Sequence, residues 1–333
     1  MAIELNRRGA LALLGAPLLA YAQSERNRLA AAWDDTEGRH HVGWLTADGS
    51  GWRVQRALAV PTRAHGLTLD GDALVVAARR PGQWLLRWPA SGEPTWAWAE
   101  PDRRFNGHVL ARGRWLYSVE ADEASGHSLL VRRDARTLAG DAEWPTGGID
   151  AHELIDLGDG SLLLALGGVP SQPETGRLKR TDQHMASSLV RLAWADGQPQ
   201  GQWTLPDANL SLRHLARHAG GTVGIALQSE AFDAAARAAA PLLALWTPAA
   251  GLRLAAQPQP LAGYGGSVVA TADGFAVSAP RAGGVGQWRA DGQWQGLQPA
   301  AEACALALVA GRLVVGAQDT LAGLRLDNHW LAG

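Results

Sequence analysis

One unit of strand and turn recurs along the chain at intervals of roughly 40 residues, and this repeat constrains the fold more than any other feature. In each copy, an apolar run, a turn containing Gly or Asp and a second apolar run precede two Trp-bearing segments, as in residues 64–99. Pairs such as Asp70–Gly71 and Asp159–Gly160 between apolar runs are hairpin turn signals. A four-strand unit repeated six or seven times is typical of a β-propeller.

We therefore predict an all-β fold, a seven-bladed β-propeller of four-stranded antiparallel blades, with six blades as the alternative. No segment of helical period separates the strands, which argues against an α/β fold. Residues 23–333 are predicted to form a single propeller domain, closed by pairing of the N-terminal strands with the C-terminal segment. Cys304 is the only cysteine, so no intramolecular disulfide can form. We interpret Cys304 as a small buried apolar residue, with a catalytic thiol as the weaker alternative.

The N-terminus predicts export. Arg7 and Arg8 precede an apolar run that ends in Ala20–Tyr21–Ala22, a small-x-small cleavage signature, so residues 1–22 are predicted to be a signal peptide. Its start resembles a twin-arginine signal, and an ordinary Sec signal is the alternative. The run is short for a membrane span, so no stable membrane insertion is expected after cleavage. The mature chain is expected in the periplasm.

Composition and motifs exclude several classes of function. The formal net charge of −2 and the lack of a basic excess argue against a nucleic-acid partner. The sequence contains no Gly-x-Ser-x-Gly, Walker loop, Cys-x-x-Cys or c-type haem motif. No catalytic signature is therefore found, and the question of an enzyme stays open.

Four histidines stand at the same place in successive repeats. His65, His108, His152 and His214 follow one another at intervals of 43, 44 and 62 residues, each just before an apolar run. In a propeller, the start of a first strand lies beside the end of the second strand, so these positions are expected to surround one mouth of the channel. Convergent polar groups in such a place are the default binding site. The candidate ligand-binding residues are His65, Arg79, Arg80, His108, Glu120, His152, Glu153, Arg213, His214, Gln228 and Arg281.

Three kinds of chemistry fit these candidates. A metal ion would be held by neutral imidazoles, with His108, His152 and His214 as the candidate ligands. A histidine paired with Glu or Arg would suit general acid–base work. The adjacent Arg79 and Arg80 suit a carboxylate or a phosphate. A purely structural role, with each histidine tying one blade to the next, is the alternative to all three.

Two insertions and the remaining histidines complete the pattern. The polar segment Ser171–Ser187 and the Ala-rich, helix-prone segment Glu230–Ala240 both leave from ends of second strands, so they are predicted to overhang the same mouth. The other histidines of the repeats are placed at turns or outer strands and are expected at the surface. They are His40, His41, His127, His218 and His329.

These motifs resemble those of one known family. "RAHGL", "NGHV", "GIDAHEL", "GRLKRTDQHMASSLVRL", "LSLRHLA", "GYGGSV" and "APRAGG" occur in one order along the mature chain. In them the sequence resembles a family of bacterial exported propellers labelled as a domain of unknown function, family number 1513. Where such proteins usually carry a His-Pro, this chain has Gln172–Pro173. A site that relies on that histidine would be altered here.

The resemblance implies a propeller plan and, by association, a role in periplasmic iron or metal handling. The implied partners are periplasmic iron-acquisition or haem proteins, but no reaction is assigned. We therefore predict an exported propeller that binds a ligand, a metal species or a partner protein at a His/Arg-lined channel mouth. The alternatives are a periplasmic enzyme (lyase, hydrolase or oxidoreductase) with a channel-mouth histidine as general base, and a scaffold for a periplasmic complex. A metal ion is the one cofactor that the residues suggest.

Overall fold

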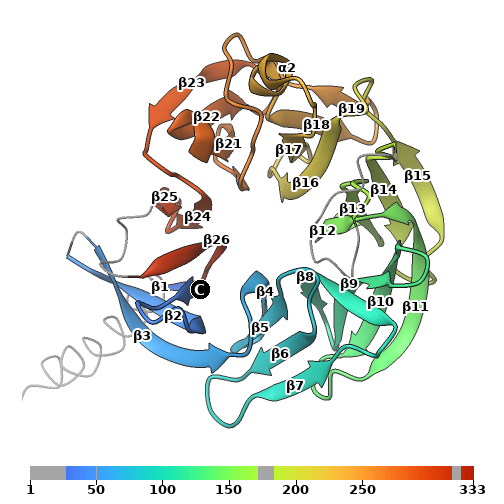
Figure 1. The fold of residues 1–333 in the computed structure, drawn as a ribbon, viewed down its shortest axis with the longest axis vertical. Helices are drawn as coiled ribbons and strands as arrows, with labels where there is room; N and C mark the ends of the chain where they lie inside the picture. The colour runs from blue at the N-terminus through green and yellow to red at the C-terminus, as the bar shows by residue number, and fades with distance from the viewer. Residues whose placement is uncertain (1–27, 50, 172–183, 317–323) are drawn as a thin grey trace, which may run out of the picture.

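The computed structural model describes residues 28–49, 51–171, 184–316 and 324–333. Their strands form antiparallel sheets arranged in a ring around a common centre (Figure 1). The predicted β-propeller of four-stranded antiparallel blades is confirmed. The ring closes as predicted, because the C-terminal strand β26 (Arg325–Ala332) pairs with the N-terminal strand β1 (Arg28–Asp34).

Each four-stranded blade runs from an inner strand at the channel to an outer strand at the rim (Figure 1). The first three, from inside outward, are β26, β1, β2 (His40–Asp48) and β3 (Gly51–Val60); β4 (Ala64–Asp70), β5 (Ala73–Ala78), β6 (Trp84–Trp88) and β7 (Thr95–Trp98); and β8 (Arg103–Arg112), β9 (Trp115–Asp122), β10 (His127–Asp134) and β11 (Gly140–Ile149). The next three are β12 (Ala151–Asp156), β13 (Ser161–Leu166), β14 (Ser188–Ala193) and β15 (Pro199–Trp203); β16 (Leu210–Arg217), β17 (Val223–Ser229), β18 (Leu243–Thr247) and β19 (Gly251–Leu254); and β20 (Val268–Ala270), β21 (Gly274–Ala279), β22 (Gly284–Arg289) and β23 (Trp294–Pro299).

The described residues form six four-stranded blades, the number that we gave as the alternative, so the prediction of seven such blades is wrong. The remaining sheet has two described strands, β24 (Ala305–Val309) and β25 (Arg312–Gly316). The physical reason lies in the closure of the ring. Only residues 317–324 separate β25 from β26, and β26 is committed to the first blade by its pairing with β1. Too little chain is left to complete another blade of four strands.

The core lies between neighbouring blades. The second strand β5 is buried along its whole length, and its alternate side chains face opposite neighbours. Leu74 and Val76 pack with Trp44 of the preceding blade, whereas Val75 and Ala77 pack with Phe105 of the following one. A strand that is buried on both faces reads as a continuous apolar run, which is the pattern of the second strands in the sequence.

The insertion Glu230–Ala240 contains the predicted helix. Helix α2 (Ala234–Ala239) begins after Asp233, whose carboxylate accepts a hydrogen bond from the backbone N–H of Ala236. The other insertion lies mostly outside the described residues, as does the predicted signal peptide. No helix among the described residues is long and apolar enough to cross a membrane. Cys304 is half-buried, and burial raises the pKa of its thiol to about 11, which disfavours the nucleophilic thiolate.

Candidate functional site

Five histidines, one from each of five inner strands, meet at the centre of the channel. They form a closed ring in which the centroids of successive imidazoles lie 4.3–4.9 Å apart, in the order His65, His108, His152, His214, His329 and back to His65. The first four were expected to converge, and they do. The prediction that His329 lies at the surface is wrong, because β26 turned out to be an inner strand of the first blade. We call these five residues the histidine cluster.

Every member of the cluster lies at a break in strand pairing. On β4, Ala64 pairs with Ala78 and Leu67 pairs with Val76. The inner strand therefore has one residue more than its neighbour between these two pairs, and His65 lies in this bulge. The same shift occurs across His152 and His214. Wider shifts surround the other two histidines. Such β-bulges re-aim side chains and are frequent beside active sites.

The two inner strands without a histidine, β20 and β24, have no such β-bulge over their described residues. The pairings of β20 with β21 and of β24 with β25 run without a register shift over the described residues. Ser267 and Cys304 precede these two strands, where the other repeats have histidine. The bulges therefore accompany the histidines and not the inner strands in general. A histidine that only tied one blade to the next would not need a bulge to turn its side chain toward the channel axis.

Glycine allows two of the histidine-bearing strands to approach closely. A Cβ atom on Gly66 would lie 2.5 Å from the carbonyl oxygen of Gly107 and 2.9 Å from Cα of His108. Gly107 itself has a φ of +100°, and a Cβ atom there would lie 2.9 Å from Cδ2 of His65. The contact between His65 and His108 thus depends on the absence of side chains at both positions.

Replacing Gly66 by Ala is therefore expected to force β4 and β8 apart and to lower the free energy of unfolding by about 1–3 kcal/mol. Urea denaturation followed by tryptophan fluorescence measures this loss. Gly51→Ala is the matched control, because the nearest atom to its added Cβ is 3.8 Å away, and its effect should stay within about 0.5 kcal/mol. Equal stability of the two variants would show that the strands can separate at no cost.

The imidazole nitrogens approach one another in the geometry of a metal site. Nε2 of His152 lies 3.4 Å from Nε2 of His214, and Nε2 of His329 lies 3.3 Å from Nε2 of His65. Two nitrogens bound at 2.0–2.1 Å to a tetrahedral ion are roughly 3.3 Å apart. One such pair belongs to each of two triads, in which three nitrogens, one per residue, lie within 4.8 Å of one another; the two triads share His108. They are His65, His108 and His329, and His108, His152 and His214.

Several nitrogens of the cluster are buried without a partner. Nε2 of His108 and Nδ1 of His152 form no hydrogen bond with any atom of the residues that the structure describes. An unsatisfied buried polar atom costs about 1–3 kcal/mol, so the cluster is expensive unless something binds to it. Two carboxylates lie behind the ring: Oε2 of Glu153 is 3.3 Å from Nδ1 of His214, and Oδ1 of Asp327 is 3.9 Å from Nδ1 of His65. Neither Nδ1 forms a hydrogen bond with a described residue, so these carboxylates act on the histidines through their charge.

Burial lowers the pKa of every histidine in the cluster, and the charges of the other histidines or of nearby arginines lower it further. The pKa values of His214 and His329 fall to about 3, and those of His65, His108 and His152 lie well below 6.5. The imidazoles are therefore neutral at physiological pH. A neutral imidazole is the form that binds a metal ion, so binding would not have to displace a proton.

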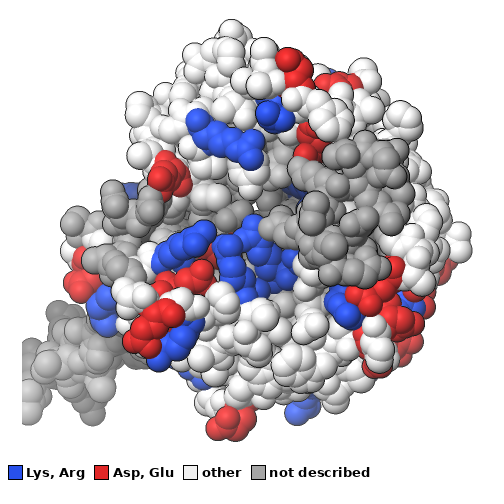
Figure 2. All heavy atoms as spheres, viewed as in Figure 1, with Lys and Arg blue, Asp and Glu red and all other residues white. Residues whose placement is uncertain are grey.

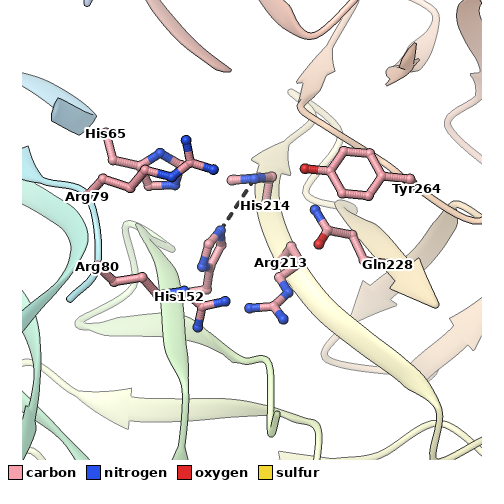
Figure 3. Close-up of a pocket in the computed structure, with 8 residues that line it drawn as sticks. All are labelled: His65, Arg79, Arg80, His152, Arg213, His214, Gln228 and Tyr264. Atoms are coloured by element: carbon pink, nitrogen blue, oxygen red, sulfur yellow. Dashed lines mark hydrogen bonds between the residues drawn. The ribbon is translucent and has the colours of Figure 1, made fainter. Parts of the chain in front are cut away.

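A pocket opens onto the cluster (Figure 3). Its lining residues are His65, Arg79, Arg80, His152, Arg213, His214, Gln228 and Tyr264. Figure 2 shows Lys and Arg side chains gathered around the centre of this face of the ring. The sequence predicted all of these residues at the mouth except Tyr264. His108 lies in the cluster and does not line the pocket.

The other predicted residues have different places. Glu153 lies behind His214 and accepts a hydrogen bond from the backbone N–H of Leu215; burial raises the pKa of its carboxyl to about 7. Arg281 is exposed, and its guanidinium stacks 4.4 Å from the ring of Tyr264 instead of lining the pocket. The expectation for Glu120 is corrected. Strand alternation turns Glu120 between the blades, where it is 3% exposed and pairs with Arg133 at 2.7 Å.

The profile of the family described as "Protein of unknown function (DUF1513)" matches residues 58–332. The chain belongs to this family. The resemblance drawn from the motifs is confirmed in this respect, since the family is the one numbered 1513. No curated protein matches the sequence significantly.

Solved structures similar to this DUF1513 protein share its fold at low sequence identity. Virginiamycin B lyase from Staphylococcus aureus is 9% identical, with a TM-score of 0.56 over 86% of this chain and 90% of the lyase. Sqt1 from Saccharomyces cerevisiae is 12% identical, with a TM-score of 0.53 over 90% of this chain and 83% of Sqt1. A functionally unknown protein from Desulfotomaculum acetoxidans is 8% identical, with a TM-score of 0.55 over 88% and 87% of the two chains. At such identities the likeness supports the propeller fold alone.

Proposed function

We propose that this DUF1513 protein binds a divalent transition-metal ion on the histidine cluster. The observation that carries the proposal is the convergence of five imidazoles, four of them buried, each placed at its own bulge, with nitrogens 3.3–3.4 Å apart in two pairs. Imidazole ligands suit zinc, copper, iron and nickel. The neutral state of the histidines and the carboxylates behind two of them favour the same function.

The alternatives have less support. An efficient general base has a pKa near the working pH, and a pKa of about 3 makes His214 or His329 a weak base. A scaffold would present a continuous apolar patch. Among the described residues, the large apolar side chains that are exposed are spread over three blades: Val54, Trp98, Phe232 and Leu254.

Export and metal handling in the periplasm are part of the proposal. The basis for export is the leader-like sequence of residues 1–22. Fractionation of cells that express the full chain would test it, with retention in the cytoplasm as the contrary result. Periplasmic iron-acquisition or haem proteins remain the proposed partners, on the ground of the family resemblance, and pull-down of native complexes is the corresponding measurement.

Metal analysis of the untagged protein tests the proposed function. Purified protein is stripped with a chelator, dialysed and titrated separately with Zn²⁺, Ni²⁺, Cu²⁺ and, without oxygen, Fe²⁺. Isothermal calorimetry is expected to show a saturable site with an affinity in the micromolar range or tighter, and bound metal should survive gel filtration. The absence of a saturable site for all four ions would refute the proposal.

A further inference from the structure

The pocket above the histidine cluster carries an excess of positive charge. Three of its lining residues are arginines, and no described residue that lines it carries a carboxylate. Asp150 lies beside the pocket and pairs with both Arg80 and Arg213, the latter at 2.8 Å. Glu230 also acts electrostatically on Arg213. Among the residues that the structure describes, these two carboxylates against three guanidinium groups leave one positive charge uncompensated before any metal ion is bound.

Arg79 accounts for that excess. It forms no ion pair with any residue that the structure describes, and its buried Nε atom has no hydrogen-bond partner. In Figure 3 its guanidinium points across the pocket toward His214. A guanidinium whose buried donor is unused is costly unless an anion accepts its hydrogen bonds. Arg79 is therefore the group that most needs a ligand.

The other two arginines, Arg80 and Arg213, are held beside the cluster by ion pairs with Asp150. Arg213 is 2% exposed, its Nη1 donates to Asp150, and its buried Nε has no partner. Asp150 adopts a left-handed backbone conformation, with a φ of 57°, just before the strand that carries His152. The carboxylate of Asp150 thereby fixes two guanidinium groups beside the cluster. In Figure 3 these groups, the Tyr264 hydroxyl and the Gln228 amide all point into the pocket.

We propose that this pocket binds a small oxyanion, with carboxylate or phosphate oxygens, which coordinates the metal ion and pairs with Arg79 and Arg213. The inference rests on the proposed function, because the ion supplies the second attachment point. An ion held by three neutral imidazoles keeps its full positive charge and has open coordination positions. The pocket is small, so it suits an anion of a few atoms and not a peptide.

Cobalt substitution tests the proposal, because the visible absorption of Co²⁺ reports changes in its ligands. The Co²⁺-loaded protein, in a buffer free of phosphate and carboxylates, is titrated separately with inorganic phosphate and with oxalate. At least one anion is expected to change the spectrum with saturation. The two titrations also distinguish phosphate from carboxylate chemistry.

Arg79→Gln is expected to weaken that anion about 10- to 100-fold while Co²⁺ stays bound, and Arg79→Lys should have an intermediate effect. Arg87→Gln is the control, since Arg87 pairs with Asp70 outside the pocket, and it should behave as the wild type. A Co²⁺ spectrum that neither anion alters, or equal anion affinity in Arg79→Gln, would overturn the inference and leave the metal site standing. Failure of the protein to bind Co²⁺ or any of the other ions would overturn the proposed function, and the oxyanion proposal with it.

Discussion

Replacement of His108 by Ala is expected to weaken metal binding about 100-fold or more, and no other single substitution in the cluster should have a larger effect. His108 belongs to both triads of nitrogens that could hold an ion, so neither triad survives its loss. Changes to residues that merely orient metal ligands cost 10- to 100-fold in affinity, and loss of a ligand should cost at least as much. Isothermal calorimetry or competition with a chromophoric chelator measures the change.

Variants that each disrupt only one triad would then show which triad holds the ion. His152→Ala removes a ligand from the triad with His214, and His329→Ala removes one from the triad with His65. If the ion lies on the triad of His108, His152 and His214, His152→Ala should bind as weakly as His108→Ala, and His329→Ala should bind almost as the wild type. The reverse result would place it on the other triad.

His127→Ala is the matched control for these variants. His127 is exposed on β10, away from the cluster, and its loss should leave affinity unchanged. Wild-type affinity in His108→Ala would contradict the model in which His108 is the shared ligand. Near-ultraviolet circular dichroism of each variant separates the loss of a ligand from the loss of the fold.

The fold was predictable because its signals are local. Turn pairs such as Asp70–Gly71 lie between short apolar runs, and both the hairpins and the buried second strands follow from them. The number of blades was harder to predict, since it depends on which strand closes the ring. Pairing of β26 with β1 is a contact between the two ends of the chain, and no local pattern encodes it.

The same closure explains why His329 was missed. Once β26 is known to be an inner strand, "LDNHW" matches "FNGHV" around His108, with an apolar residue, polar or small residues, the histidine and an apolar residue. The signal was therefore present, but the repeat that contains it begins at one end of the chain and finishes at the other. Counting repeats from the N-terminus assigned His329 to a turn or an outer strand.

The β-bulges limit how well the sequence predicts the direction of a single side chain. A strand with an extra residue breaks the alternation of period two, so the sequence does not show which way residues near the bulge point. The histidines were found because they recur, and not because their direction was known. Glu120 on the regular strand β9 shows the opposite error: its position in the chain suggested the mouth, but alternation turns it toward Arg133.

The metal-free protein is expected to lose stability steeply as the pH falls from about 6 to about 4.5, and the histidine cluster is the cause. The pKa of a buried His108 lies well below its unfolded value of 6.5, so below that pH the unfolded chain binds a proton that the folded chain does not. The contribution of each such histidine to the free energy of unfolding is fully present above pH 6.5. As the pH falls below that value, each contribution decreases by about 1.4 kcal/mol per pH unit. Glu153 acts in the opposite direction, because its folded pKa of about 7 exceeds 4.5.

His108→Gln isolates one histidine from this sum. Its free energy of unfolding, measured by urea denaturation with a chelator at several pH values, should decline less steeply than that of the wild type by about 1.4 kcal/mol per pH unit. The slope is decisive even if the variant is less stable at every pH, since lost packing shifts the curve without changing its slope. The exposed His127 provides the control His127→Gln, which should keep the wild-type slope. An unchanged slope in His108→Gln would mean that His108 takes up its proton in the folded protein, and that the interior of the cluster is open to water.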